Sequence, residues 1–196
     1  LVDKSSIFTA YDEGIDELHA DHDDIIILCH DDIRILTDPT VFTTILKEKL
    51  TKPDTGFVGV AGTTILSNSG IWWDQEFWQK GKHSGCVIHG LDLVNPDDTY
   101  FGKLGQVSVL DGVFLATTKK TLRSIQLTKP SMFEGSWDFY DIFYTIQTHL
   151  KKKKNFTVPI QIMHESRGEL VGRDSWHKNR QAFCAIFKDH LPTSVS

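Results

Sequence analysis

The sequence predicts a layered α/β domain, and three observations indicate this fold class. At 196 residues the chain has the length of one ordinary domain with its own hydrophobic core. Hydrophobic residues make up 40% of the chain and charged residues 24%, a balance typical of globular proteins. Segments with strand character alternate with segments of helix character along the chain. In such domains ligands bind outside the carboxyl ends of the strands.

Helices are expected over residues 5–18, 39–50, 137–150 and 174–190. The second of these is the best defined, because Asp38 is a typical N-cap residue and Pro39 suits the first helical position. An apolar stripe then runs from Val41 to Leu50 and should face the sheet. The last segment is an amphipathic helix with aromatic residues on its apolar face.

Strands are expected over residues 25–29, 57–62, 107–115 and 156–163. The first, Ile25 to Cys29, is a continuous apolar run of the kind found in strands that are covered on both faces. Pro159 predicts that the fourth strand lies at an edge or contains a bulge. The strands are thus interleaved with helices, as in α/β sheets.

Charge and cysteine content exclude several classes of protein. The 26 acidic residues outnumber the 21 basic ones, and a net charge of −5 makes nucleic acid an unlikely partner by repelling phosphate. No apolar run approaches the about 20 residues that a membrane helix needs. The 3 cysteines are far apart and lack metal-ligand spacing, as expected of reduced thiols. We therefore expect a soluble cytoplasmic protein.

Two adjacent carboxylates follow the first strand directly, in the triplet His30, Asp31 and Asp32. This position places them at the carboxyl end of a strand, where a ligand cleft is expected. Carboxylate oxygens suit Mg²⁺ or Mn²⁺, which complete their coordination with water and substrate phosphates. The alternative is that both residues only start a turn and bond to their own backbone. The triplet alone does not decide between these two interpretations.

Several segments resemble GT-A glycosyltransferases. Residues 11–16 and 24–32 are similar to the helix, apolar strand and acidic pair of that group. Residues 56–62, 72–73 and 109–117 resemble its StrF-like branch, known from streptomycin biosynthesis, and the chain is also similar to the capsid glycosyltransferases of large chlorella viruses. The resemblance covers roughly residues 5–180. It implies the nucleotide-diphospho-sugar transferase fold, with a central, mixed, mostly parallel sheet flanked by helices.

The resemblance also implies a domain organisation. All 196 residues are expected to form a single GT-A-like domain. GT-A domains usually have a strand, a helix and a second strand before the region that matches Leu1. It stays open whether the chain is part of a longer polypeptide and whether its first nucleotide-binding strand is missing.

A metal site is the first functional feature that the resemblance implies. The last acid of the family's D-x-D motif binds the metal, and it corresponds to Asp32, with Asp31 as a further candidate. His30 stands where the family has its first acid. His164 resembles the late histidine that adds a metal ligand, and residues 165–168 beside it could reach a diphosphate. We expect Mn²⁺ or Mg²⁺ as the cofactor.

Three acids are candidates for the transfer itself. Asp111 precedes Gly112 and is expected to bind sugar hydroxyls or act in the transfer, although an Asp-Gly turn is an equal alternative. Asp138 and Asp141 resemble the acidic stretch that supplies the base in inverting relatives. They are three residues apart and can share one helical face. If Asp138 is only a first-turn acid, the helix dipole explains it.

Further candidates concern the donor. The residues expected to bind the nucleotide sugar are Asp12, Asp31, Gly59, Ala61, Gly62, Trp72 and Trp73. Small residues would allow the donor to approach the backbone, and tryptophan rings can cover the apolar face of a sugar. At least one of the two tryptophans is expected to belong to the core.

The resulting hypothesis is a metal-dependent hexosyltransferase. It would move a hexose or deoxyhexose from a UDP-sugar to a glycan or glycoprotein acceptor, such as a viral capsid protein in the host cytoplasm. A non-catalytic nucleotide-sugar-binding module is the main alternative. A different metal-dependent phosphate enzyme, such as a nucleotidyltransferase, is the third.

Overall fold

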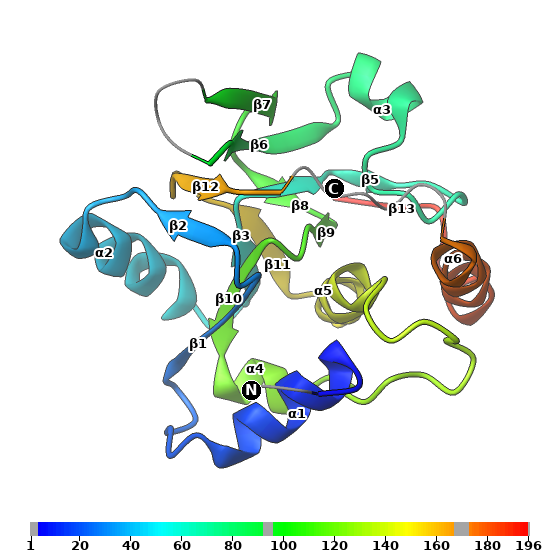
Figure 1. Ribbon diagram of the computed structural model, residues 1–196, viewed down its shortest axis with the longest axis horizontal. Coiled ribbons are helices and arrows are strands. Elements are labelled where there is room, and N and C mark those ends of the chain that lie inside the picture. The colour runs from blue at the N-terminus through cyan, green and yellow to red at the C-terminus, as the bar shows by residue number, and fades with distance from the viewer. Residues whose placement is uncertain (1–3, 92–95, 167–172, 196) are drawn as a thin grey trace.

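The computed structural model describes residues 4–91, 96–166 and 173–195 as helices packed around two main sheets (Figure 1). The helices are α1 (Ile7–Glu17), α2 (Pro39–Leu50), α3 (Gln75–Gln79), α4 (Lys119–Arg123), α5 (Tyr140–Leu150) and α6 (Asp174–Ile186). The strands are β1 (Ile25–Cys29), β2 (Ile33–Ile35), β3 (Thr55–Gly59), β4 (Ala61–Thr63), β5 (Ile65–Leu66), β6 (His83–His89), β7 (Asp97–Gly102), β8 (Gln106–Val107), β9 (Val109–Leu110), β10 (Phe114–Thr118), β11 (Lys154–Thr157), β12 (Ile162–His164) and β13 (Thr193–Ser194).

The expected helices are present as α1, α2, α5 and α6. In α2 the Asp38 carboxylate caps the helix by accepting hydrogen bonds from the backbone of Thr40 and Val41, as predicted. The start of α5 and the end of α6 differ most from the expectation. Helix α5 begins at Tyr140 rather than Trp137, because Phe139 has a left-handed φ of 68° that no helical residue adopts. Helix α6 ends at Ile186.

Three of the four expected strands are each divided between the two main sheets. Residues 57–62 contribute to β3 and β4, residues 107–115 to β8, β9 and β10, and residues 156–163 to β11 and β12. Between β3 and β4 the chain changes sheets at Val60, whose carbonyl accepts a hydrogen bond from Cys86. Between β11 and β12 it passes through Pro159, which has no amide hydrogen for a ladder.

The five-stranded sheet has the order β1-β10-β3-β11-β8, and the six-stranded sheet contains β2-β12-β6-β4-β9 with β7 paired to β6. Among the strand pairs of the described residues, only β3–β11 and β6–β12 are parallel. The sheets are therefore mixed, as expected, but the prediction of mostly parallel pairing is wrong. That prediction followed from the family resemblance, and the apolar runs of the sequence do not determine the direction in which strands pair.

Strand β1 shows why the pattern was misleading. It lies at an edge of its sheet and pairs only with β10 among the described strands. Ile26 and Leu28 are buried, whereas the Ile27 side chain on the other face is 38% exposed. The expectation that this strand is covered on both faces is therefore wrong, because only one of its faces packs against the core.

The core lies between the sheets and the central helix α5. Helices α2 and α5 lie on opposite sides of the strands β3 and β10, and α6 lies beyond α5 (Figure 1). Tyr144 of α5 is fully buried, and its hydroxyl donates to the Leu127 carbonyl. Its ring packs edge-on against Phe8 of α1. Within the described parts of the chain, none of the helices has the length and apolar character that spanning a bilayer requires.

Candidate active site

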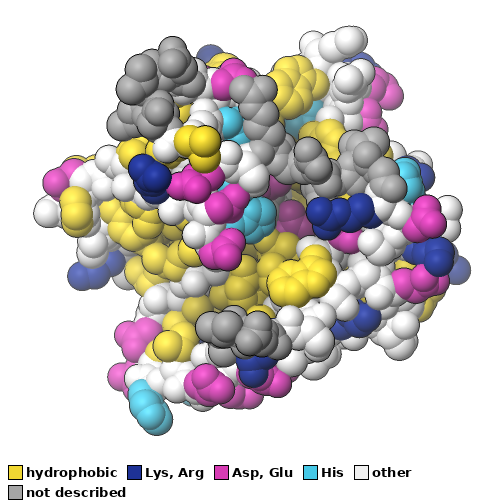
Figure 2. Space-filling view, in the orientation of Figure 1, with side chains coloured by type: hydrophobic (Ala, Val, Ile, Leu, Met, Phe, Trp, Pro, Cys, Tyr) yellow, Lys and Arg dark blue, Asp and Glu magenta, His cyan; other side chains and the backbone are white. Residues whose placement is uncertain are grey.

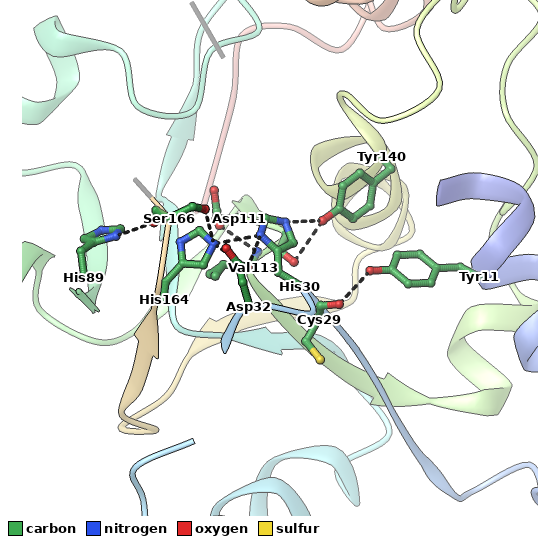
Figure 3. A network of polar contacts seen from close by, with 11 residues as sticks. Tyr11, Cys29, His30, Asp32, His89, Asp111, Val113, Tyr140, His164 and Ser166 are labelled. Carbon is green, nitrogen blue, oxygen red and sulfur yellow. Dashed lines mark hydrogen bonds and ion pairs between the residues drawn. The ribbon is translucent and has the colours of Figure 1, made fainter. Parts of the chain in front are cut away.

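Two histidines and one aspartate converge where the two main sheets meet. His30, Asp32 and His164 each offer a ligand atom, and these three atoms lie within 4.8 Å of one another. The His164 Nε2 is 3.2 Å from the Asp32 Oδ1 and 3.2 Å from the His30 Nδ1. The His30 Nδ1 is 4.0 Å from the Asp32 Oδ1. Figure 3 shows these side chains pointing toward one another.

Strand pairing explains why residues 134 positions apart meet. His30 and Asp32 occupy the turn from β1 to β2, and the His30 amide donates to the Val113 carbonyl. Strand β2 pairs with β12 so that Ile33 lies opposite His164. The Glu165 amide donates to the Asp32 carbonyl and closes this pairing. The fold thus brings the end of β12 to the acidic turn, as expected from the carboxyl-end rule.

The geometry of the three ligand atoms fits a divalent transition metal. Ligands at about 2.1 Å from a metal stand about 3.0 to 3.4 Å apart in octahedral or tetrahedral sites. Two of the three separations, at 3.2 Å, fall in this range. Two imidazoles with one carboxylate suit manganese, iron, cobalt or zinc better than magnesium, which prefers oxygen ligands. The donor set is therefore able to hold such an ion and leave positions for substrate oxygens.

Hydrogen bonds fix the orientation of His30. The Tyr140 hydroxyl is 3.1 Å from the His30 Nε2 and donates its proton to the Gly112 carbonyl at 3.1 Å. Since the hydroxyl has only one proton, the His30 Nε2–H must donate to it. This tautomer leaves the lone pair on the His30 Nδ1, which faces Asp32 and His164. Tyr140 thus prepares His30 as a ligand.

We expect Tyr140→Phe to weaken metal binding by about 10- to 100-fold, the range for loss of an outer-shell partner of a metal ligand. The physical reason is that His30 loses the acceptor that selects its tautomer. Isothermal titration with Mn²⁺ measures the effect. Tyr144→Phe is the matched control, because its hydroxyl bonds to the Leu127 carbonyl, away from His30. Equal affinities for Tyr140→Phe and the parent would contradict the role of Tyr140.

The surroundings of Asp32 and His164 favour the protonation states in which these groups bind metals. Burial raises the pKa of Asp32, but the hydrogen bond from Ser166 and the electrostatic influence of the two neighbouring imidazoles, His164 and His30, outweigh it, so the pKa is lowered. Burial lowers the pKa of His164, with His30 adding to this effect while Asp32 opposes it. A carboxylate and a neutral imidazole are the forms that bind metals.

A pair of carboxyl groups lies next to the cluster. Asp111 and Asp141 flank Gly112, whose amide donates to the Asp141 Oδ2 at 3.0 Å. The Asp111 Oδ1 accepts from the Val113 amide at 2.9 Å, which forms the turn that leads into β10. Burial, together with the negative charge of Asp111, raises the pKa of Asp141 to about 7. Asp111 therefore has a turn-forming role here, which leaves its second oxygen available to a ligand.

Asp141→Asn should change the pH dependence of stability. A raised pKa in the folded state means that ionisation of Asp141 costs stability as the pH rises from its ordinary value of 3.8 to about 7. The amide cannot ionise and can still accept from Gly112. The free energy of unfolding, measured in urea at pH 4 and pH 8, should therefore fall less in the variant than in the parent. An identical pH dependence in both proteins would contradict the buried, coupled ionisation.

A cavity of about 120 Å³ opens beside His30. It is lined by His30, Gly70, Trp72, Trp73, Asp111, Gly112, Trp137, Asp138, Phe139, Tyr140, Asp141, Ile142 and Trp176. All three acids expected in the transfer therefore border one space that adjoins the cluster of His30, Asp32 and His164. In the space-filling view, acidic and histidine side chains gather near the middle of this face, next to large hydrophobic side chains (Figure 2).

Asp138 is the most deeply buried acid of the cavity, at 5% exposure. It precedes α5 and does not cap the helix, because the N-cap residue is Phe139 and makes no side-chain cap bond. Burial raises the pKa of Asp138, although Arg173 and Ser175 partly oppose this. The Asp138 Oδ1 has no hydrogen-bond partner among the described residues. A buried, unpartnered carboxyl oxygen at a cavity is available to a substrate hydroxyl.

Trp72 and Trp73 have different environments. Trp72 is 5% exposed and packs against Trp73 and Phe101, which confirms that at least one of the pair belongs to the core. Trp73 is half-buried. We expect Trp72→Ala to cost about 3 to 5 kcal/mol of unfolding free energy, the usual loss for a buried aromatic side chain. Trp73→Ala should cost less and should raise a substrate KM, and urea unfolding with steady-state kinetics separates the two effects.

Several predicted residues lie outside the cluster and the cavity. Asp31 is exposed and is not among the three clustered ligands. Asp12 lies on α1 and forms an ion pair with Arg123 of α4 at 3.8 Å. Their assigned roles stay predictions. Arg167 and Gly168, expected near the diphosphate, lie outside the described residues.

The small residues Gly59, Ala61 and Gly62 are buried in β3 and β4. A Cβ atom at Gly62 would lie 2.4 Å from the Val109 carbonyl oxygen, and one at Gly59 would lie 2.9 Å from that of Phe114. Close packing of strands thus accounts for both glycines. Their role in donor binding stays a prediction.

Sequence reasoning missed several residues of the site, and four of them bear on its chemistry. His30 was treated as a departure from an acidic motif, although it supplies one of the three clustered ligand atoms. Tyr140, Trp137 and Trp176 were not assigned to a site, although all three line the cavity. The only signal in the sequence was that Trp137 and Tyr140 flank the acid Asp138.

Comparison with known proteins identifies the family of the chain. The model of a family described as "Glycosyltransferase like family" matches residues 1–185. The chain therefore belongs to this glycosyltransferase-like family, and a transferase that uses a sugar donor and an acceptor is the activity that membership implies. A search of curated proteins gave no match.

Proposed function

We propose that the chain is a metal-dependent hexosyltransferase that moves a hexose or deoxyhexose from a UDP-sugar to a glycan or glycoprotein. The observation that carries the proposal is the contact between the His30, Asp32 and His164 cluster and the acid-lined cavity, which share His30. Diphosphate and acceptor need such adjacent sites, because the sugar passes between them. A StrF-like GT-A enzyme acting on a viral capsid glycoprotein in host cytoplasm is the specific form that the sequence resemblance favours.

Residues of the cluster would hold Mn²⁺ or a similar ion, which compensates the charge of the diphosphate leaving group. His30 and His164 each present a ring nitrogen atom and Asp32 presents a carboxylate oxygen. Of the two ions expected from the sequence, Mn²⁺ accepts imidazole ligands more readily than Mg²⁺ does. We therefore expect Mn²⁺ to support activity better than Mg²⁺.

Asp138 is the residue best suited to take a proton from the acceptor hydroxyl. A general base works best when its pKa lies near the operating pH, and burial raises the pKa of Asp138 toward that range. Asp141 suits this role less well, because its Oδ2 already accepts from the Gly112 amide. Asp111 lines the same cavity and would bind sugar hydroxyls through its second oxygen.

The test is a screen of nucleotide sugars with the purified 196-residue chain, with Mn²⁺, with Mg²⁺ and with EDTA. Release of UDP together with transferred or hydrolysed sugar, dependent on metal, is the expected result. Binding of the nucleotide sugar without turnover would identify a non-catalytic binding module instead. Release of inorganic diphosphate without sugar transfer would identify a nucleotidyltransferase. Anomeric assignment of the product then decides between inversion and retention.

A further inference from the structure

Tryptophan is concentrated at one place in this molecule. The chain has 5 tryptophans, and four of them (Trp72, Trp73, Trp137 and Trp176) line the cavity beside His30. The fifth, Trp78, packs against His83 and Phe101 and does not line this cavity. These four residues come from three separate parts of the chain, so the fold has gathered them.

Three of these tryptophan rings pack against one another, whereas the fourth is largely exposed. The Trp73 ring lies 5.8 Å from that of Trp72 and 5.8 Å from that of Trp176, measured between centroids. Trp176 also packs against Phe139 at 5.4 Å. Trp137 differs from these residues, because it lines the cavity and is still 53% exposed. It therefore marks the place where the cavity meets solvent.

A carboxyl group lies beside the tryptophan rings in the lining of the cavity. The adjacent residue, Asp138, is buried at the same cavity, and its Oδ1 has no partner among the described residues. Its Oδ2 has one long contact, 3.4 Å from the Ser175 hydroxyl. A buried carboxyl with unused acceptor capacity is stabilised when a ligand donates hydrogen bonds to it. Hydroxyl groups are donors of this kind.

A pyranose complements this lining, because C–H groups cover one face of its ring and hydroxyl groups, which can donate hydrogen bonds, surround its edge. A volume of about 120 Å³ suits one ring rather than an extended chain. On the His30 side, the cavity adjoins the cluster that is proposed to hold the metal ion and, through it, the donor diphosphate. Trp137 lies on the solvent side of the cavity. A ligand that enters from solvent reaches Trp137 first.

We propose that this cavity binds the terminal pyranose of a saccharide acceptor, with Trp137 against the C–H face of the ring and Asp138 accepting from its hydroxyls. The inference rests on the proposed function and makes it more specific, since it selects a glycan over an amino-acid side chain as the acceptor. It also identifies Trp137, which lies outside the cluster of His30, Asp32 and His164, as a determinant of acceptor binding.

The experiment measures saccharide binding without donor and without metal. The probes are the methyl glycosides of glucose, galactose, mannose, rhamnose and fucose, each titrated with saturation-transfer NMR and tryptophan fluorescence. We expect at least one glycoside to bind the parent protein. Trp137→Ala should bind it about tenfold more weakly, the effect of losing one aromatic contact, and Trp137→Phe should retain most of the affinity. Trp78→Ala, which is 39% exposed in the parent, is the matched control and should bind normally.

The possible outcomes separate this inference from the proposed function. If no glycoside binds, or if Trp137→Ala binds as tightly as the parent, the acceptor site is refuted even where the nucleotide-sugar screen shows turnover. If Trp137→Ala weakens binding of the UDP-sugar but not of UDP, the cavity holds the donor sugar and the inference is wrong. If the glycosides bind as expected but the screen shows no turnover, the hexosyltransferase assignment fails while the saccharide site stands.

Discussion

Asp32→Ala is expected to abolish metal-dependent binding of the nucleotide sugar while leaving the fold intact. Asp32 supplies the only carboxylate of the three-residue cluster, and its Oδ1 lies 3.2 Å from the His164 Nε2. Loss of an outer-shell partner of a metal site costs about 10- to 100-fold in affinity, so loss of a direct ligand should cost more than about a hundredfold. Titration with Mn²⁺ and then with UDP-sugar measures the loss, and circular dichroism checks the fold.

Asp31→Ala is the matched control for this experiment. The two residues are adjacent and chemically identical, but Asp31 is exposed and outside the clustered ligands. The control variant should therefore titrate with Mn²⁺ much as the parent does. An equal loss of Mn²⁺ affinity in both variants would show that Asp31 is also a metal ligand, as the sequence resemblance implied. Parent-like turnover of Asp32→Ala with Mn²⁺ present would rule out the proposed metal site.

Asp138→Asn is expected to lower kcat by about 10²- to 10⁴-fold, the usual contribution of a general base. The amide has nearly the same shape but cannot take a proton from the acceptor hydroxyl. Donor KM and the Mn²⁺ titration should stay unchanged, because Asp138 is not among the clustered ligands. A loss of kcat with the donor KM unchanged marks an interaction that the donor alone does not make in its ground state and that is made in the transition state. Steady-state kinetics with the best donor of the screen provides the measurement.

The free energy of unfolding of Asp138→Asn provides a second test of the role of Asp138. Because burial raises the pKa of Asp138, the folded state binds its proton more tightly than the unfolded chain does. Ionisation of Asp138 therefore costs stability as the pH rises above the ordinary value of 3.8 through the raised pKa. At pH 8 Asp138→Asn should be at least as resistant to urea as the parent. A clear loss of stability would show that the carboxylate has a structural role.

Asp174→Asn is the control for the base. Asp174 is an exposed acid in the first turn of α6 and does not line the cavity. It should keep full turnover. If Asp138→Asn also keeps full turnover, the base assignment is wrong. A retaining mechanism, in which the leaving diphosphate takes the acceptor proton, would then be the next hypothesis to test.

Local sequence signals were sufficient where the determining contacts are local. Asp38 and Pro39 defined the start of α2 because capping depends on residues a few positions apart. The position of Asp32 directly after an apolar strand indicated a ligand site, and the structure places its carboxylate in the three-residue cluster. The family resemblance added His164, which lies in the same cluster.

Strand pairing could not be determined in this way. The run from residue 107 to residue 115 reads as one strand, but it divides into β8, β9 and β10, which lie in both sheets. An apolar run records burial and does not record which strand will be its neighbour. The parallel or antiparallel direction of each pair depends on such distant neighbours, and for this reason the predicted sheet was wrong in direction.

The sequence by itself determined the α/β class, the main helices and the position of one carboxylate of the candidate metal site, because each depends on contacts between residues close together in the chain. Only the tertiary structure decided that His30 belongs to the candidate metal site, since its place there depends on Tyr140, 110 positions away, and on His164, 134 positions away. The gathering of four tryptophans around Asp138 has the same origin. Such contacts form when β1, α5, β12 and α6 pack together, and no local pattern encodes that packing.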